Sequence, residues 1–113
     1  MYICIAEQKD TRLMKNVKIL YDSELRTSRS SCSFARVVEI DGHRFKVTHD
    51  TGNCYSNTRI SVQTPTKEWA LVATDFDLVG KPSINYVSDE YLKKKQMEDI
   101  YQASLTYIKK AIL

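Results

Sequence analysis

The chain has 113 residues, which is enough for one domain with one hydrophobic core. Hydrophobic residues make up 42% of it and charged residues 27%, values that exclude an intrinsically disordered protein. The formal net charge of +3 is mildly basic and does not by itself indicate nucleic acid binding. We therefore expect a single domain over residues 1–113.

The cysteines and the N-terminus indicate a cellular setting. Cys4, Cys32 and Cys54 are widely spaced and form neither a C-x-x-C motif nor a Cys/His cluster of zinc-site spacing. The apolar run at the N-terminus is too short for a signal peptide, because a charge arrives at Glu7. No stretch is long enough to cross a membrane. These features predict a cytoplasmic protein with free thiols, no membrane, no metal and no cofactor.

The first part of the chain gives a mixed signal. Tyr2–Ala6 is apolar on both faces and predicts a buried strand. Thr11–Leu25 is ambiguous, since some of its apolar residues follow a helical period whereas Val17, Ile19 and Tyr21 alternate as in a strand. We favour a helix at the start of this segment and leave the rest open.

The clearest element is a hairpin with strands Phe34–Ile40 and His43–His49. Between them lies Asp41-Gly42, a strong hairpin signal because a type I′ turn needs positive φ at both central residues. This loop sets a register with three pairs: Ile40 with His43, Val38 with Phe45, and Glu39 with Arg44. On the second strand the inward positions are Phe45 and Val47, and the outward positions are Arg44, Lys46 and Thr48.

A second hairpin is predicted around Thr64-Pro65-Thr66, with strands Arg59–Gln63 and Lys67–Thr74. Its apolar positions are Ile60, Val62, Trp69, Leu71 and Ala73. Residues Asp75–Val87 should form an irregular crossing with a turn at Gly80-Lys81-Pro82.

The last element is a helix. Ser88 can cap it, and Asp89 and Glu90 suit the positive N-terminal end of a helix dipole. An apolar stripe recurs at helical spacing: Met97, Tyr101, Leu105, Ile108 and Ile112. The sequence therefore predicts the α+β class, with a hairpin-rich antiparallel sheet of about five strands packed by a long C-terminal helix.

Asp50-Thr51-Gly52 is the tripeptide of aspartic protease active sites. Because a hairpin turn and a strand lead into it, this short stretch resembles the retroviral-type aspartic proteases. The resemblance implies a homodimer in which Asp50 of each copy belongs to a shared dyad that Thr51 braces. The chain departs from that family at His49 and Asn53, which flank the tripeptide, and it lacks a Gly-rich flap.

The same tripeptide is also an ordinary way to leave a strand. Asp accepts local backbone hydrogen bonds and Gly takes positive φ, and this interpretation is the one that we prefer. His43 and His49 lie at opposite ends of one predicted strand, too far apart to act together on one phosphate, so a small nuclease would need another partner for either. Cys54 follows His49 without a spacing that requires a Cys–His pair.

The most suggestive stretch is the basic loop Arg26-Thr27-Ser28-Arg29-Ser30-Ser31. Guanidinium and hydroxyl groups hold phosphate, and a basic sheet face beside the loop would extend the site. An aromatic ring on that face would offer a stacking surface for a base. The residues expected to bind an anionic ligand are Arg26, Arg29, Ser30, Arg36, Arg44, Lys46, Tyr55 and Arg59.

These features predict a small non-enzymatic binding protein for an anionic ligand, either a nucleotide-type small molecule or a nucleic acid. The general character of the chain suits a viral or mobile-element accessory or inhibitor protein. Apolar and aromatic surface on the C-terminal helix favours a homo-oligomer or a protein partner. Two alternatives stay open: the homodimeric protease that uses Asp50, Thr51 and Gly52, and a protein–protein interaction module.

Overall fold

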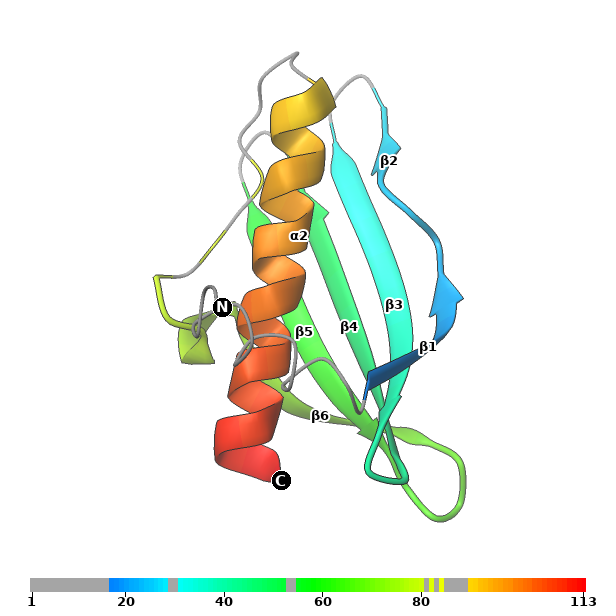
Figure 1. The fold of residues 1–113 in the computed structure, drawn as a ribbon. Coiled ribbons are helices and arrows are strands. Elements are labelled where there is room, and N and C mark those ends of the chain that lie inside the picture. Colours follow the sequence, from blue (N-terminus) through cyan, green and yellow to red (C-terminus); the bar gives the residue numbers. More distant parts are fainter. Residues whose placement is uncertain (1–16, 29–30, 53–54, 81, 83, 85–89) are drawn as a thin grey trace, which may run out of the picture.

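The computed structural model describes residues 17–28, 31–52, 55–80, 82, 84 and 90–113. Within these residues, the chain forms a six-stranded sheet and a long C-terminal helix (Figure 1). The strands are β1 (Val17–Asp22), β2 (Arg26–Thr27), β3 (Cys32–Ile40), β4 (His43–Thr51), β5 (Ser56–Gln63) and β6 (Trp69–Thr74). The helical segments are the 3-10 turn η1 (Asp75–Asp77), α2 (Glu90–Tyr107) and the π-helical η2 (Ile108–Ile112). The predicted α+β class is confirmed.

The sheet is an antiparallel meander in which one further short strand pairs beside the first. Its order is β1-β3-β4-β5-β6, and the short β2 pairs with β3. The ambiguous segment before residue 25 forms strand β1 from Val17 onward. Four expectations lie outside the described residues: the strand Tyr2–Ala6, the helix at the start of Thr11–Leu25, the cap at Ser88 with Asp89, and the Lys81 position of the predicted turn.

The central hairpin has the predicted loop and register. Asp41 and Gly42 adopt φ values of 50° and 83°, as a type I′ turn requires. Strands β3 and β4 pair without interruption from Ile40–His43 at the turn to Cys32–Thr51 at the far end. The predicted pairs and the inward positions are therefore confirmed, because buried and less buried residues alternate along both strands.

The second hairpin is also confirmed, although β6 begins at Trp69 rather than at Lys67. The Lys67 N–H donates to the Thr64 carbonyl at 2.8 Å, and the Thr64 N–H donates to the Glu68 carbonyl at 2.8 Å. Lys67 takes a positive φ of 68°, which lets the chain turn back within this short loop.

A β-bulge changes the side-chain pattern of β6. Ile60 pairs with Ala73, but the next residue of β5, Ser61, pairs with Leu71. Because the bulge adds one residue to β6, it moves Leu71 away from the core, and its side chain is 55% exposed.

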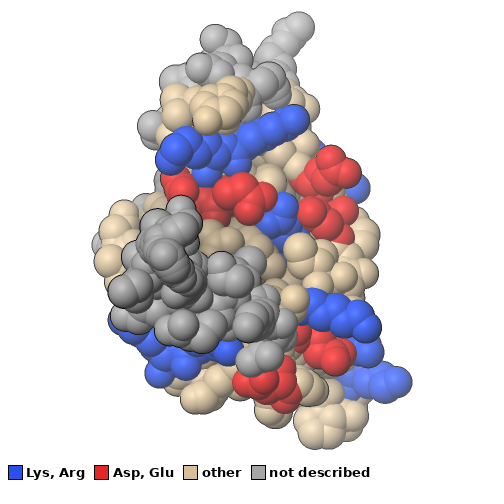
Figure 2. Space-filling model, in the orientation of Figure 1, with Lys and Arg blue, Asp and Glu red and all other residues tan. Residues whose placement is uncertain are grey.

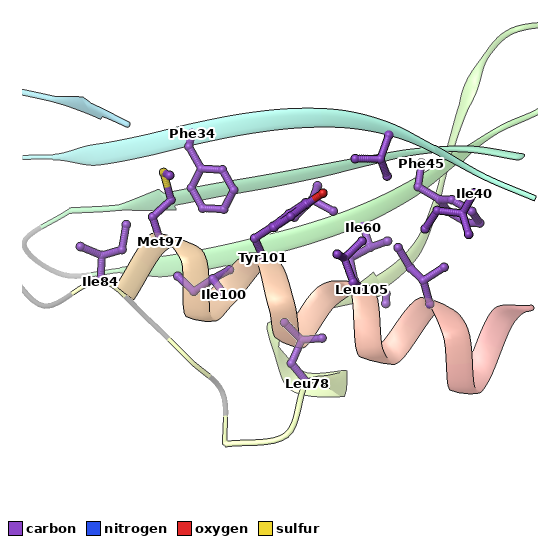
Figure 3. Packing of buried hydrophobic residues seen from close by; sticks show 14 of the residues in the cluster. Phe34, Ile40, Phe45, Ile60, Leu78, Ile84, Met97, Ile100, Tyr101 and Leu105 are labelled. Carbon is purple, nitrogen blue, oxygen red and sulfur yellow. The ribbon is translucent and has the colours of Figure 1, made fainter. Parts of the chain in front are cut away.

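The hydrophobic core lies between the sheet and α2 (Figure 3). The predicted stripe is confirmed at Met97, Tyr101, Leu105 and Ile108, which are buried, whereas Ile112 is partly buried against them. The sheet contributes the buried side chains of Cys32, Phe34, Val38, Ile40, Phe45, Val47, Ile60 and Ala73. In the described part of the chain, no helix has the length and apolar character needed to span a bilayer.

Candidate functional site

The strand pleat separates the predicted ligand residues onto two faces. Arg36 shares the inner face of β3 with Phe34 and Val38 and is only 7% exposed. The prediction that it joins Arg44 and other cations on one exposed face is therefore wrong. Arg44, Lys46 and Arg59 alternate with buried residues and lie on the opposite face, which no described helix covers (Figure 1). We call this opposite side the outer face.

Rows of paired residues build the outer face. One row joins Lys18, Glu39 and Arg44, and the next joins Tyr21, Val37, Lys46, Ser61 and Leu71. A third joins Ala35, Thr48, Arg59 and Thr74, and a fourth joins Arg26, Ser33, Asp50 and Asn57. Arg26, the first residue of the predicted basic loop, lies in strand β2 and therefore shares one surface with the cations of the sheet. Arg29 and Ser30 lie outside the described residues.

Two depressions lie side by side on the outer face. The first has a volume of about 310 Å³, and the residues that line it include Tyr21, Arg26, Ala35, Thr48 and Asp50. The second has a volume of about 280 Å³ and is lined by Thr48, His49, Asp50, Asn57 and Arg59. Their linings include short side chains, Ala35 in the first and Thr48 in both. The residues common to both are Thr48, His49 and Asp50.

The cations of the outer face differ in how they are partnered. Arg44 pairs with Glu39 at 3.4 Å, and both side chains are exposed. The Lys46 ammonium lies 4.8 Å from the centre of the Trp69 ring, a cation–π distance. Arg26 and Arg59 are exposed and form no ion pair with any described acidic residue. These two guanidinium groups can therefore meet an external anion without losing an internal ion-pair partner.

The opposite side of the molecule carries a different charge pattern. Figure 2 shows the α2 side, where acidic and basic side chains lie in small neighbouring groups. Lys95 and Asp99 pair there across one helical turn at 3.5 Å. On the outer face, by contrast, the acids among the paired rows are Glu39 and Asp50, and Lys18, Arg26, Arg44, Lys46 and Arg59 are the cations.

Asp50 and Tyr55 form a small unit at the end of β4. The Tyr55 hydroxyl lies 3.5 and 3.4 Å from the two carboxylate oxygens of Asp50, longer than an ordinary O–H···O bond. The Gly52 N–H donates to the Tyr55 carbonyl at 2.9 Å and closes this connection. Gly52 does not take the positive φ that we expected. Glycine is needed instead because the Tyr55 ring approaches it closely.

Replacing Gly52 with alanine is expected to lower the free energy of unfolding by about 1 kcal/mol. A Cβ at this position would lie 2.4 Å from Cε1 of Tyr55, so the ring would have to move away from Asp50. The half-exposed ring can move, which keeps the cost moderate. Chemical denaturation of G52A, Y55A and the double variant checks this. The double variant should lose little beyond Y55A alone; equal costs with and without the ring would contradict the explanation.

The protease interpretation depends on where the tripeptide lies in the strand. Asp50 and Thr51 are both inside β4 and pair with β3 on one side and β5 on the other, so only Gly52 leaves the strand. Asp50 is exposed and Thr51 is buried. The dyad implied by the resemblance needs Asp50 of a second copy.

His49, the second of the two histidines in β4, has a buried, neutral side chain. His49 is 2% exposed, and its Nδ1 lies 2.8 Å from the Thr58 hydroxyl while its Nε2 is hydrogen-bonded to the Thr51 hydroxyl. Its ring stacks on Phe34 at a centroid distance of 6.0 Å. Burial lowers the pKa of His49 to about 4, although the charges of Asp50 and Asp75 oppose the shift. Both nitrogens already have partners, so the ring stabilises the fold rather than presenting a free base.

Arg36 forms the polar centre of the interface between β1, β3 and α2. Its Nη1 and Nη2 donate to the two carboxylate oxygens of Glu98 at 3.3 and 2.8 Å. Its Nε lies 3.1 Å from Oδ2 of Asp22, an ion-pair distance without a well-aligned hydrogen bond. The guanidinium carbon lies 4.4 Å from the centre of the Tyr101 ring. No sequence pattern reveals Glu98 as the partner of Arg36, because its place opposite Arg36 depends on how α2 packs on the sheet.

The pKa values of this cluster follow from burial and pairing. Burial acts to lower the pKa of Arg36, but its hydrogen bonds with Glu98 and its ion pair with Asp22 outweigh burial and raise it. For Asp22, burial acts to raise the pKa, and the Glu24 backbone and Arg36 lower it overall. Burial raises the pKa of Tyr101. Arg36 is therefore charged and bound to Glu98 and Asp22. It does not belong to the candidate ligand site.

Within the described residues, no group of three or more His, Cys, Asp or Glu side chains is placed to hold a metal ion. The candidate site is thus the outer face around Arg26, Asp50, Tyr55 and Arg59. Comparisons of the chain with protein-family models, with curated proteins and with solved structures found no match.

Proposed function

We propose that this protein is a small non-enzymatic binding protein that holds a nucleotide-type anion, free or within a nucleic acid strand, on its outer face. The observation that carries the proposal is the placement of Arg26 and Arg59. They flank two adjoining depressions, and neither forms an ion pair with a described acidic residue. Guanidinium groups with free donors bind phosphate in a bidentate manner, and they do so more strongly than neutral donors.

The neighbouring side chains suit the rest of such a ligand. Tyr55 is 47% exposed and Tyr21 is 51% exposed, so each can present part of a ring for stacking. Ser33, Thr48 and Asn57 supply hydroxyl and amide groups to sugar or base atoms between the two arginines. A phosphate, a sugar and a base therefore each find a matching group on one surface.

Replacing Arg59 with alanine is expected to weaken nucleotide binding about tenfold, because one charge-assisted contact is lost. The measurement is isothermal titration calorimetry with AMP, GMP and a single-stranded pentanucleotide, each at low and moderate salt. R26A should behave in the same way. Affinity should also fall as salt rises, since phosphate contacts release counterions.

The matched control for this experiment is R44A. Arg44 lies on the same face, but its guanidinium already pairs with Glu39, so its loss should change affinity less than threefold. Absence of binding to all three probes would overturn the proposal. So would equal affinities for R59A, R26A and R44A.

The proposal includes a cytoplasmic setting and a homo-oligomer. Cys32 is a buried free thiol, which is ordinary in a reducing compartment. Leu71 and Val72 on the edge strand β6 are exposed and can contribute apolar surface to a second copy. Native mass spectrometry of the purified chain reports the assembly, and a monomer at all concentrations would remove the oligomer from the proposal.

A further inference from the structure

Asp50 is a negatively charged side chain on the face that we propose to bind phosphate. It sits in the row that joins Arg26, Ser33 and Asn57, and it lines both depressions. It forms no ion pair with any described cation, and its contact with Tyr55 is long. A carboxylate here repels a bare phosphate. A ligand that fills both depressions must therefore bring hydrogen-bond donors to Asp50 as well as an anion to the arginines.

The strand geometry lets one ligand satisfy both demands. Arg59 lies two residues beyond Asn57, the direct partner of Asp50, so Asp50 and Arg59 are diagonal neighbours with backbones about 7–8 Å apart. Arg26 is two strands from Asp50 in the same row, about 10 Å away. A long arginine side chain can therefore hold a phosphate group while the other end of the same ligand reaches Asp50.

The chemistry of the carboxylate selects among the bases. An ionised aspartate offers two acceptor oxygens side by side and no donor. Guanine carries two adjacent donors, N1–H and the N2 amino group, on its Watson–Crick edge. Adenine and cytosine place an acceptor nitrogen beside their amino group, and uracil places its one donor between two carbonyl oxygens. Only guanine among the four meets both oxygens with donors.

We propose that the outer face recognises guanosine phosphates, with Asp50 accepting from N1–H and N2–H of the base and Arg59 or Arg26 holding the phosphate. Tyr55, which borders Asp50, supplies the stacking ring. This inference rests on the proposed function and names its ligand class. The guanosine phosphate can be a free nucleotide or one position of a single strand.

The test is a specificity switch in D50N. Calorimetric affinities for GMP, IMP, AMP and XMP are compared between wild type and D50N, together with pyrimidine pentanucleotides that carry one central G or one central A. In the wild type, GMP should bind about tenfold more tightly than AMP, with IMP between them because it lacks the N2 donor. In D50N the ratio of XMP to GMP affinity should rise about tenfold, because asparagine offers one donor and one acceptor and xanthine has a carbonyl at position 2.

The matched control is D41N, which makes the same change of charge at the far end of strand β4. Asp41 is exposed in the hairpin turn at φ 50°, a conformation that asparagine tolerates, so the base preference of D41N should equal that of wild type.

The two probe sets distinguish the two sources of the ligand. A guanine preference seen with mononucleotides identifies a free nucleotide site, and a preference seen only with pentanucleotides identifies a single-strand site.

Two results would overturn the inference in distinguishable ways. Equal affinity for all bases in both probe sets, with binding still weakened by R59A, would refute guanine recognition and leave the proposed function standing. Failure of every probe to bind would refute both. A guanine preference that D50N leaves unchanged would remove Asp50 as the specificity-determining residue and overturn the proposal.

Discussion

Replacing Arg36 with alanine is expected to lower the free energy of unfolding by about 3 kcal/mol. The guanidinium holds the Glu98 carboxylate of α2 with two hydrogen bonds and the Asp22 carboxylate of β1 at 3.1 Å. Its removal leaves two carboxylates close together at the edge of the core. The loss stays at the low end for buried ion pairs, because the side chains of Glu98 and Asp22 are 49% and 29% exposed.

Two further variants are compared with R36A: R36M separates the charge of Arg36 from its packing, and R44A is a control. R36M keeps an unbranched apolar side chain at this position and should recover part of the loss, since arginine also stabilises through its stem. R44A removes an arginine from the other face of the same sheet, where the pair with Glu39 is exposed, and should cost less than about 0.5 kcal/mol. Urea denaturation measures all three. A loss in R36A no larger than in R44A would show that the cluster does not hold the helix on the sheet.

Acidification from pH 6.5 to pH 4 is expected to remove about 2–3 kcal/mol of stability through His49 alone. Burial lowers the pKa of this imidazole from 6.5 to about 4 in the folded protein. The unfolded chain therefore takes up a proton below pH 6.5 that the folded chain does not take up until about pH 4. The contribution is complete above pH 6.5 and is lost as the pH falls to 4.

The measurement is the free energy of unfolding at closely spaced pH values for wild type, H49Q and H43Q. Carboxylates titrate in the same range, so the difference between wild type and H49Q isolates the histidine. H49Q should flatten the slope between pH 6.5 and 4, and H43Q should keep it, because His43 is exposed. Parallel curves for wild type and H49Q would refute the explanation.

The hairpins and the helix were predictable because local chemistry sets them. Asp41-Gly42 fixes the turn, and the turn fixes the register of β3 and β4. That register also contained the signal for Arg36, which has the same parity as Val38 and Ile40 and so had to point inward. Its partners were not predictable, since Glu98 lies 62 residues further along the chain and meets it only through the docking of α2.

The candidate site was predictable only in part. The cationic residues stood out as residue types, but their meeting on one surface depends on the pairing of β2 with β3 and of β5 with β4. The exposure of Leu71 depends on the bulge opposite Ile60 and Ser61, which no alternation pattern reveals. The sequence predicts a positive φ at Gly52, whereas the structure explains this glycine by the close approach of the Tyr55 ring.

The alternation of β3, β4 and β5 divides their residues between two independent tasks. The fully buried side chains of these strands lie on the inner face, and the outer-face residues alternate with them along each strand. Substitutions on the outer face should therefore change the packing of the core little. Such a sheet is a ready template for directed evolution: positions 33, 35, 48, 50, 57 and 59 can be randomised together as one library, and most members should still fold.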